Sequence, residues 1–120
     1  MYRRFYFSLM HRQVLEVISR GQAERDAEDV RSALATVNVG HRRELVEALG
    51  KARSLRYFAA DILRLLMDPL CEQHVAAALR WEQGDGETIE AYAALSEAAD
   101  WRVRAAAVLA LDILDPAGSG

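Results

Sequence analysis

Cys71 and His74 are the pair of residues in this sequence that most directly suggests a chemical role. They lie three positions apart, so on a helix both side chains could face one metal ion. A zinc site needs at least three protein ligands, and two residues fall short of that number. We therefore expect no metal site, and we interpret Cys71 as a small buried thiol and His74 as a surface imidazole.

Nucleophilic catalysis is the second chemistry that Cys71 could support. A cysteine near the start of a helix can have a lowered pKa, because the free N–H groups there favour the thiolate. Its neighbours Asp68 and Glu72 are acidic and would oppose ionisation. The chain also contains no P-loop, GxGxxG or GxSxG motif. We expect no catalytic residue, no cofactor and no enzymatic activity.

Basic residues near two predicted helix starts could bind phosphate groups. Arg42 and Arg43 follow Gly40, while Arg53 and Arg56 flank the next start. A nucleic-acid binder usually carries a strongly basic surface, whereas this chain has a formal net charge of −3. Nucleic acid is therefore a disfavoured partner, and we interpret these arginines as the charged rim of a protein contact.

The composition describes one small helical domain. The chain has 120 residues, rich in the helix formers alanine (21) and leucine (15), with a single cysteine that excludes an internal disulfide. Fourteen of the 15 basic residues are arginine, which hints at a bacterial, GC-rich origin. Residues 1–60 carry a net charge of +4 and residues 61–120 a net charge of −7, so the charge is polarised along the chain.

The N-terminus has two arginines before an apolar stretch, as some targeting signals do. The stretch ends at His11, which makes it too short for a secretory signal. No segment approaches the roughly 20 apolar residues of a membrane span. We expect a cytoplasmic protein that does not enter a membrane, with its first residues inside the fold.

Apolar residues recur every three to four positions, which predicts helices throughout. We expect residues 1–116 to form one domain and residues 117–120 to form a flexible tail. Asp68 and Pro69 predict the start of the fifth helix, as N-cap and first helical residue. The seven expected helices are 3–20, 26–36, 41–50, 55–67, 69–82, 87–98 and 101–114.

Two stretches of the chain match one another at an offset of 46 residues. The match aligns Ala48–Leu66 with Ala94–Asp112 and pairs leucines and arginines in register, for example Arg56 with Arg102. Internal repeats of 20 to 50 residues usually form stacked helix pairs. We therefore expect an internal repeat.

Residues 91–114, AYAALSEAADWRVRAAAVLALDIL, resemble a HEAT repeat of the bacterial phycobilisome-lyase type. The likeness lies in the turn at Asp100, the pair Val103 and Arg104, and the small residues of the second helix. It is weaker over residues 45–66, where Ser54 replaces the aspartate. The resemblance implies a short, irregular, right-handed stack of antiparallel helical hairpins. Some HEAT-like enzymes hold iron with His-Glu pairs, but no histidine here precedes a glutamate.

The first and last helices have apolar sides that are wide for surface helices. The last helix, 101–114, is apolar almost all round, so either the first helix, a second copy or another protein should cover it. In the first helix, aromatic residues beside an arginine are typical of interface anchors. The residues that we expect to contact a partner are Tyr2, Arg3, Phe5, Tyr6, Leu9, Arg42, Arg43 and Arg56.

These observations predict an all-α, HEAT-like domain that acts as a protein-interaction or regulatory module without chemistry. Its partner is a protein, and a homodimer is possible. Two alternatives remain open. One is an immunity or antitoxin protein that neutralises a toxin by covering it, and the other is a HEAT-like nucleic-acid binder.

Overall fold

The computed structural model describes residues 2–117, with side chains from residue 10 onward. This part of the chain is entirely helical, as the sequence predicts, with seven α-helices and one short 3-10 helix. None of its helices is both long enough and apolar enough to cross a membrane. The elements are α1 (Tyr2–Ser19), α2 (Ala27–Leu34), α3 (Val39–Lys51), η1 (Leu55–Phe58), α4 (Ala59–Leu66), α5 (Glu72–Trp81), α6 (Gly86–Leu95) and α7 (Trp101–Leu114).

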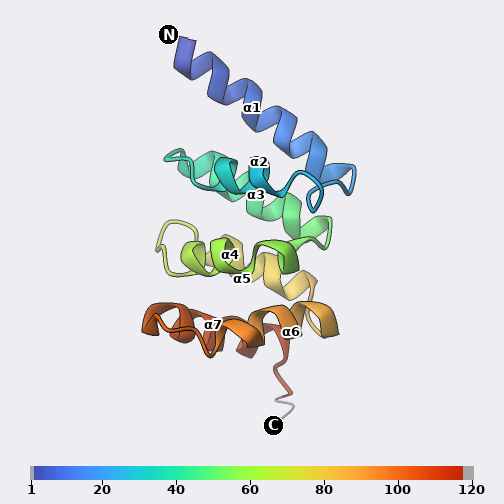
Figure 1. The fold of residues 1–120 in the computed structure, drawn as a ribbon, viewed down its shortest axis with the longest axis vertical. Helices are drawn as coiled ribbons and strands as arrows, with labels where there is room; N and C mark the ends of the chain where they lie inside the picture. Colours follow the sequence, from blue (N-terminus) through green and yellow to red (C-terminus); the bar gives the residue numbers. More distant parts are fainter. Residues whose placement is uncertain (1, 118–120) are drawn as a thin grey trace.

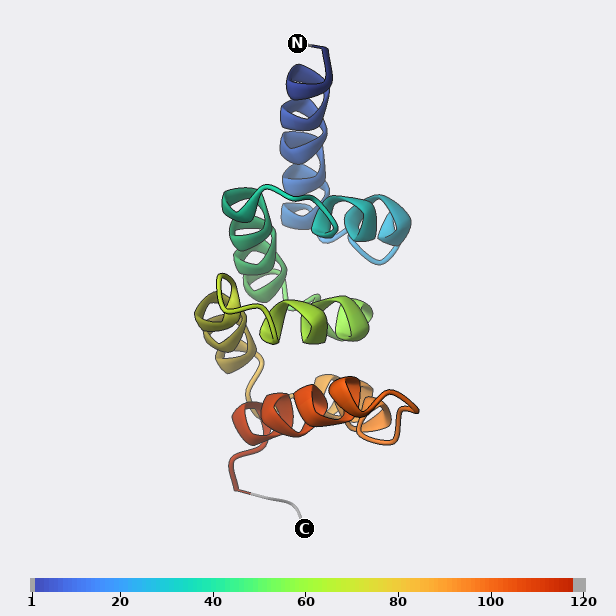
Figure 2. The same cartoon turned by 90° about the vertical axis from the view of Figure 1, so that its left-hand side faces the viewer.

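The helices form layers along the longest axis of the molecule. Three hairpins follow one another, α2 with α3, α4 with α5, and α6 with α7, while α1 lies at the opposite end from α6 and α7 (Figure 1). The described chain measures 51 × 28 × 23 Å. Helices α3, α5 and α7 pack successively on one another, and α1 packs on α2 and α3 (Figure 2). The prediction of an all-α stack of helical hairpins is confirmed.

The core lies between the layers and consists of aliphatic side chains with two large aromatic ones. Phe58 and Tyr92 are the largest fully buried residues. Helices α3 and α5 approach closely where Gly50 faces Ala78. A Cβ atom added to Gly50 would lie only 2.9 Å from the Ala78 Cβ, so the approach requires glycine at this position. Small residues also face inward on α7, where Ala106, Ala107 and Ala110 are buried.

Side-chain caps define the starts of three helices. The side chains of Asn38, Asp85 and Asp100 accept hydrogen bonds from backbone N–H groups in the first turns of α3, α6 and α7. Each cap satisfies donors that the helix cannot satisfy internally. The predicted N-cap role of Asp100 is confirmed, and α7 has the predicted bounds.

The predicted helices 26–36 and 87–98 end earlier in the structure, at Leu34 and Leu95, and two further predicted helices differ for a local structural reason. Helix α5 begins at Glu72, because Pro69–Cys71 form a tight turn in which Asp68 Oδ1 accepts from the Leu70 N–H at 2.9 Å. Asp68 thus caps a turn that precedes the helix. The predicted helix 55–67 is divided into η1 and α4, because Phe58 leaves helical geometry with φ −128° and ψ 31°.

The two stretches matched at an offset of 46 residues hold different places in the stack. In the first stretch, α4 is the opening helix of its hairpin; in the second, α7 is the closing helix. The register of the sequence match therefore does not correspond to the register of the hairpins. The matched leucines also differ in burial, because Leu63 is 1% exposed whereas Leu109 is 51% exposed.

Candidate functional site

The first turn of α3 brings Arg42 and Arg43 to the edge of the stack where the chain turns within each hairpin. Arg42 Nη1 lies 3.1 Å from Asp68 Oδ2, and Arg43 Nε donates to the Leu70 carbonyl at 2.8 Å. Both partners belong to the turn between α4 and α5. The two arginines therefore join the α2–α3 layer to the next layer.

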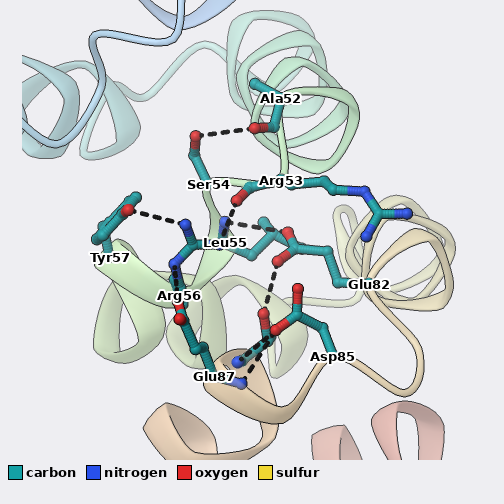
Figure 3. A network of polar contacts seen from close by, with 10 residues as sticks. Ala52, Arg53, Ser54, Leu55, Arg56, Tyr57, Glu82, Asp85 and Glu87 are labelled. Atoms are coloured by element: carbon teal, nitrogen blue, oxygen red, sulfur yellow. Dashed lines mark hydrogen bonds and ion pairs between the residues drawn. The ribbon is translucent and has the colours of Figure 1, made fainter.

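Arg56 lies apart from these two residues, in η1. Its Nε is 3.2 Å from Glu87 Oε2, and its Nη2 donates to the Tyr57 hydroxyl at 2.9 Å. A third bond runs from Nη1 to the Arg53 carbonyl at 2.9 Å (Figure 3). The three predicted rim arginines thus do not form one continuous patch, and each is engaged within the chain.

Beside Arg56 lies a buried carboxylate that the sequence analysis missed. Glu82 is 0% exposed and accepts hydrogen bonds from the Leu55 N–H at 3.1 Å and from the Thr88 hydroxyl at 2.7 Å (Figure 3). Burial raises the pKa of Glu82, while these two hydrogen bonds oppose the shift. The carboxylate joins η1, the end of α5 and the start of α6.

A signal for Glu82 was present in the sequence. Val75, Ala78 and Leu79 are buried, and Glu82 continues their helical spacing onto the same face of the chain. A buried aromatic residue completes this junction, because the Tyr92 hydroxyl donates to the Leu55 carbonyl at 3.1 Å. The site has no exposed atom of Glu82 to meet a substrate, so its arrangement suits a structural role.

Cys71 and His74 lie in different environments. Cys71 is 0% exposed, whereas the His74 side chain is exposed, as the interpretation from sequence expected. Burial raises the pKa of the Cys71 thiol, and Asp68 adds to this effect while Arg42 and Arg43 oppose it. Residues 10–117 contain no cluster of three or more metal-ligating side chains.

A histidine pair joins α1 to α3. The rings of His11 and His41 stack with their centroids 3.8 Å apart, and Glu44 Oε2 lies 3.5 Å from His11 Nε2. Burial lowers the pKa of His11, and the nearby His41 lowers it further, while Glu44 opposes the shift. The packing of α1 on α3 therefore favours the neutral form of the His11 imidazole.

The predicted contact residues of the first helix lie outside the side chains that the structure describes. These are Tyr2, Arg3, Phe5, Tyr6 and Leu9. The described half of α1 borders a groove against α2, in which Met10, Val14 and Val17 face Val30. The acidic residues Asp26 and Asp29 also line this groove.

The outer face of α7 is a candidate contact surface. It presents Trp101, Val108 and Leu109, which are 62%, 52% and 51% exposed. The opposite face of the same helix is buried against α4, α5 and α6. The expectation that α1 could fold back over α7 is wrong, because the two helices lie at opposite ends of the stack (Figure 1).

Comparisons with protein-family models, with curated proteins and with solved structures found no match to this chain. The HEAT-like resemblance therefore stays a prediction from the sequence. The candidate site is therefore defined by the geometry of this chain alone. It is the outer face of α7, which consists of the exposed residues Trp101, Val108 and Leu109 together with the half-buried Ala105.

Proposed function

We propose that this chain is a cytoplasmic protein-interaction module of HEAT-like type, which binds a protein partner through helix faces and performs no chemistry. The outer face of α7 is its main contact surface. Recognition rests on burial of apolar side chains, with charged residues at the edge that set the orientation of the partner.

The exposure of Trp101, Val108 and Leu109 on one helix of the last layer is the main support for this function. Elsewhere in the described stack, each hairpin packs against the next one. Tryptophan is among the residues that contribute most binding energy at protein interfaces, because it buries a large area at little cost in side-chain entropy. An uncovered face of this kind is typical of an interaction site.

The positions of the arginines support a protein partner over nucleic acid. Arg42, Arg43 and Arg56 each contact a group of the chain itself, so their positive charge is partly used within the fold. A phosphate backbone would have to compete with those contacts. The immunity or antitoxin alternative uses the same kind of surface and differs only in the identity of the partner.

Site-specific photocrosslinking tests the proposal. A benzoylphenylalanine at position 108 is expected to form covalent adducts with a protein in the cells that make the chain. The matched control is the same group at Val37, which is 94% exposed but lies in the turn between α2 and α3. Adducts from position 108 that disappear with Leu109→Asp support the function; equal adduct yields at positions 108 and 37 would overturn it.

A further inference from the structure

We propose that the outer face of α7 binds the same face of a second copy of this chain, with the two α7 helices antiparallel about a two-fold axis. This inference rests on the proposed function and names its partner. The two stacks would then meet end to end through their α6–α7 layers.

The residues on the outer face of α7 have the spacing of a helix–helix seam. Trp101, Ala105, Val108 and Asp112 are separated by four, three and four positions, so they follow one line along the helix. Leu109 lies beside this line. Ala105 sits near the middle, where a small side chain lets two helices approach closely. An antiparallel pair would place Ala105 of each copy against Val108 of the other.

The charges on this face are complementary to those of a reversed copy of the same face. Arg102 lies in the first turn and Asp112 in the last, about 15 Å apart at 1.5 Å per residue. Both side chains are exposed, and neither has an ion pair with another described residue.

In an antiparallel pair, Arg102 of each copy meets Asp112 of the other, which forms two equivalent ion pairs. The indole N–H of Trp101 adds a second donor for the same carboxylate. A parallel pair would instead place Arg102 beside Arg102 and Asp112 beside Asp112. Like charges in contact disfavour that arrangement, so the charge pattern selects the antiparallel one.

Light scattering on charge-reversal variants tests the pairing. Wild-type chain is expected to be a dimer at micromolar concentration. Arg102→Glu and Asp112→Arg are each expected to raise the dissociation constant of the dimer at least about tenfold. In either homodimer, positions 102 and 112 of the two copies carry the same charge, so two like-charged pairs are in contact.

A one-to-one mixture of the two variants is expected to restore pairing. In the mixed dimer, the introduced glutamate of one chain meets the introduced arginine of the other. The remaining pair is the native one, with Asp112 of the first variant against Arg102 of the second. A double variant that carries both reversals restores the homodimer for the same reason.

The matched control is Arg80→Glu, an exposed arginine on α5 that should leave the dimer unchanged. Circular dichroism verifies that each variant retains its helices. A wild-type monomer up to high micromolar concentration, or a mixture that stays monomeric, overturns self-pairing. In that case crosslinks from position 108 to a different protein would leave the proposed function standing, whereas their absence would overturn both.

Discussion

At the scale of single residues, Glu82 shows how a charged side chain can be placed in a core. Its carboxylate accepts hydrogen bonds from the N–H of Leu55, the first residue of η1, and from the hydroxyl of Thr88 in α6. A buried polar group without partners costs free energy, so the two donors and the acceptor depend on one another. The cost of burying the charge is reflected in the raised pKa of Glu82.

Replacing Glu82 separates the roles of its shape and its charge. Glu82→Ala is expected to lower the free energy of unfolding by about 2–4 kcal/mol, because it leaves a cavity and an unpaired Leu55 N–H. Glu82→Gln keeps an acceptor oxygen for that N–H and fills the same space, so its loss should be clearly smaller. Urea denaturation followed by circular dichroism measures both, and equal losses would contradict the role of the hydrogen bonds.

The pH dependence of the same variants gives a second readout. Because the pKa of Glu82 is raised on folding, the native chain binds more protons than the unfolded chain between the ordinary value of 4.5 and the raised value. The contribution of Glu82 to the free energy of unfolding therefore falls as pH rises through this window. Glu82→Gln should remove this part of the slope.

At the scale of the elements, the contact of α3 with α5 depends on the absence of a side chain at Gly50. A Cβ at this position would lie 2.9 Å from Ala78 Cβ and 3.1 Å from Ala78 Cα. These distances are too short for carbon atoms in contact, and one of them involves the backbone. The glycine lies inside the last turn of α3, so its role is close packing between two helices.

Gly50→Ala is expected to destabilise the protein by about 1–3 kcal/mol, because α3 and α5 must move apart. Helix propensity alone predicts the opposite, a gain of up to about 1 kcal/mol. The matched control is Gly86→Ala in the first turn of α6, where an added Cβ meets no atom within 4 Å. Thermal denaturation compares the two variants. A neutral or stabilising effect at position 50 would contradict the close contact.

At the scale of the whole molecule, residues of the basic and acidic halves of the sequence form ion pairs between layers. Arg31 lies 3.5 Å from Asp61, Arg42 lies 3.1 Å from Asp68, and Arg56 lies 3.2 Å from Glu87. Each of these arginines belongs to the basic half of the sequence and each acid to the acidic half. The charge difference therefore favours the observed order of layers.

Hydrogen exchange measures how stability is distributed over the stack. Helix α5 packs against α-helices on both sides of its layer, α3 and α7, whereas α2 has α1 on one side and only the short η1 on the other. We expect the amides of α5 to exchange at least about tenfold more slowly than those of α2. One common protection factor for both helices would show that the layers open only together.

Features that depend on local spacing follow from the amino-acid sequence alone. The bounds of α7, the cap at Asp100 and the all-helical class all follow from side chains within a few positions of one another, so they could be read from the chain. The start of α5 was missed by three residues, because Asp68 caps the turn at Pro69–Cys71 instead of the helix.

Which helix faces pack against one another depends on the tertiary structure. The separation of α1 from α7, the register of the hairpins and the burial of Glu82 all depend on contacts between residues far apart in the chain. Helical periodicity reports that a face is apolar, but the same pattern serves a face buried in the core and one left for a partner. The free energy of packing distinguishes them, and it is set by the arrangement of all the helices together.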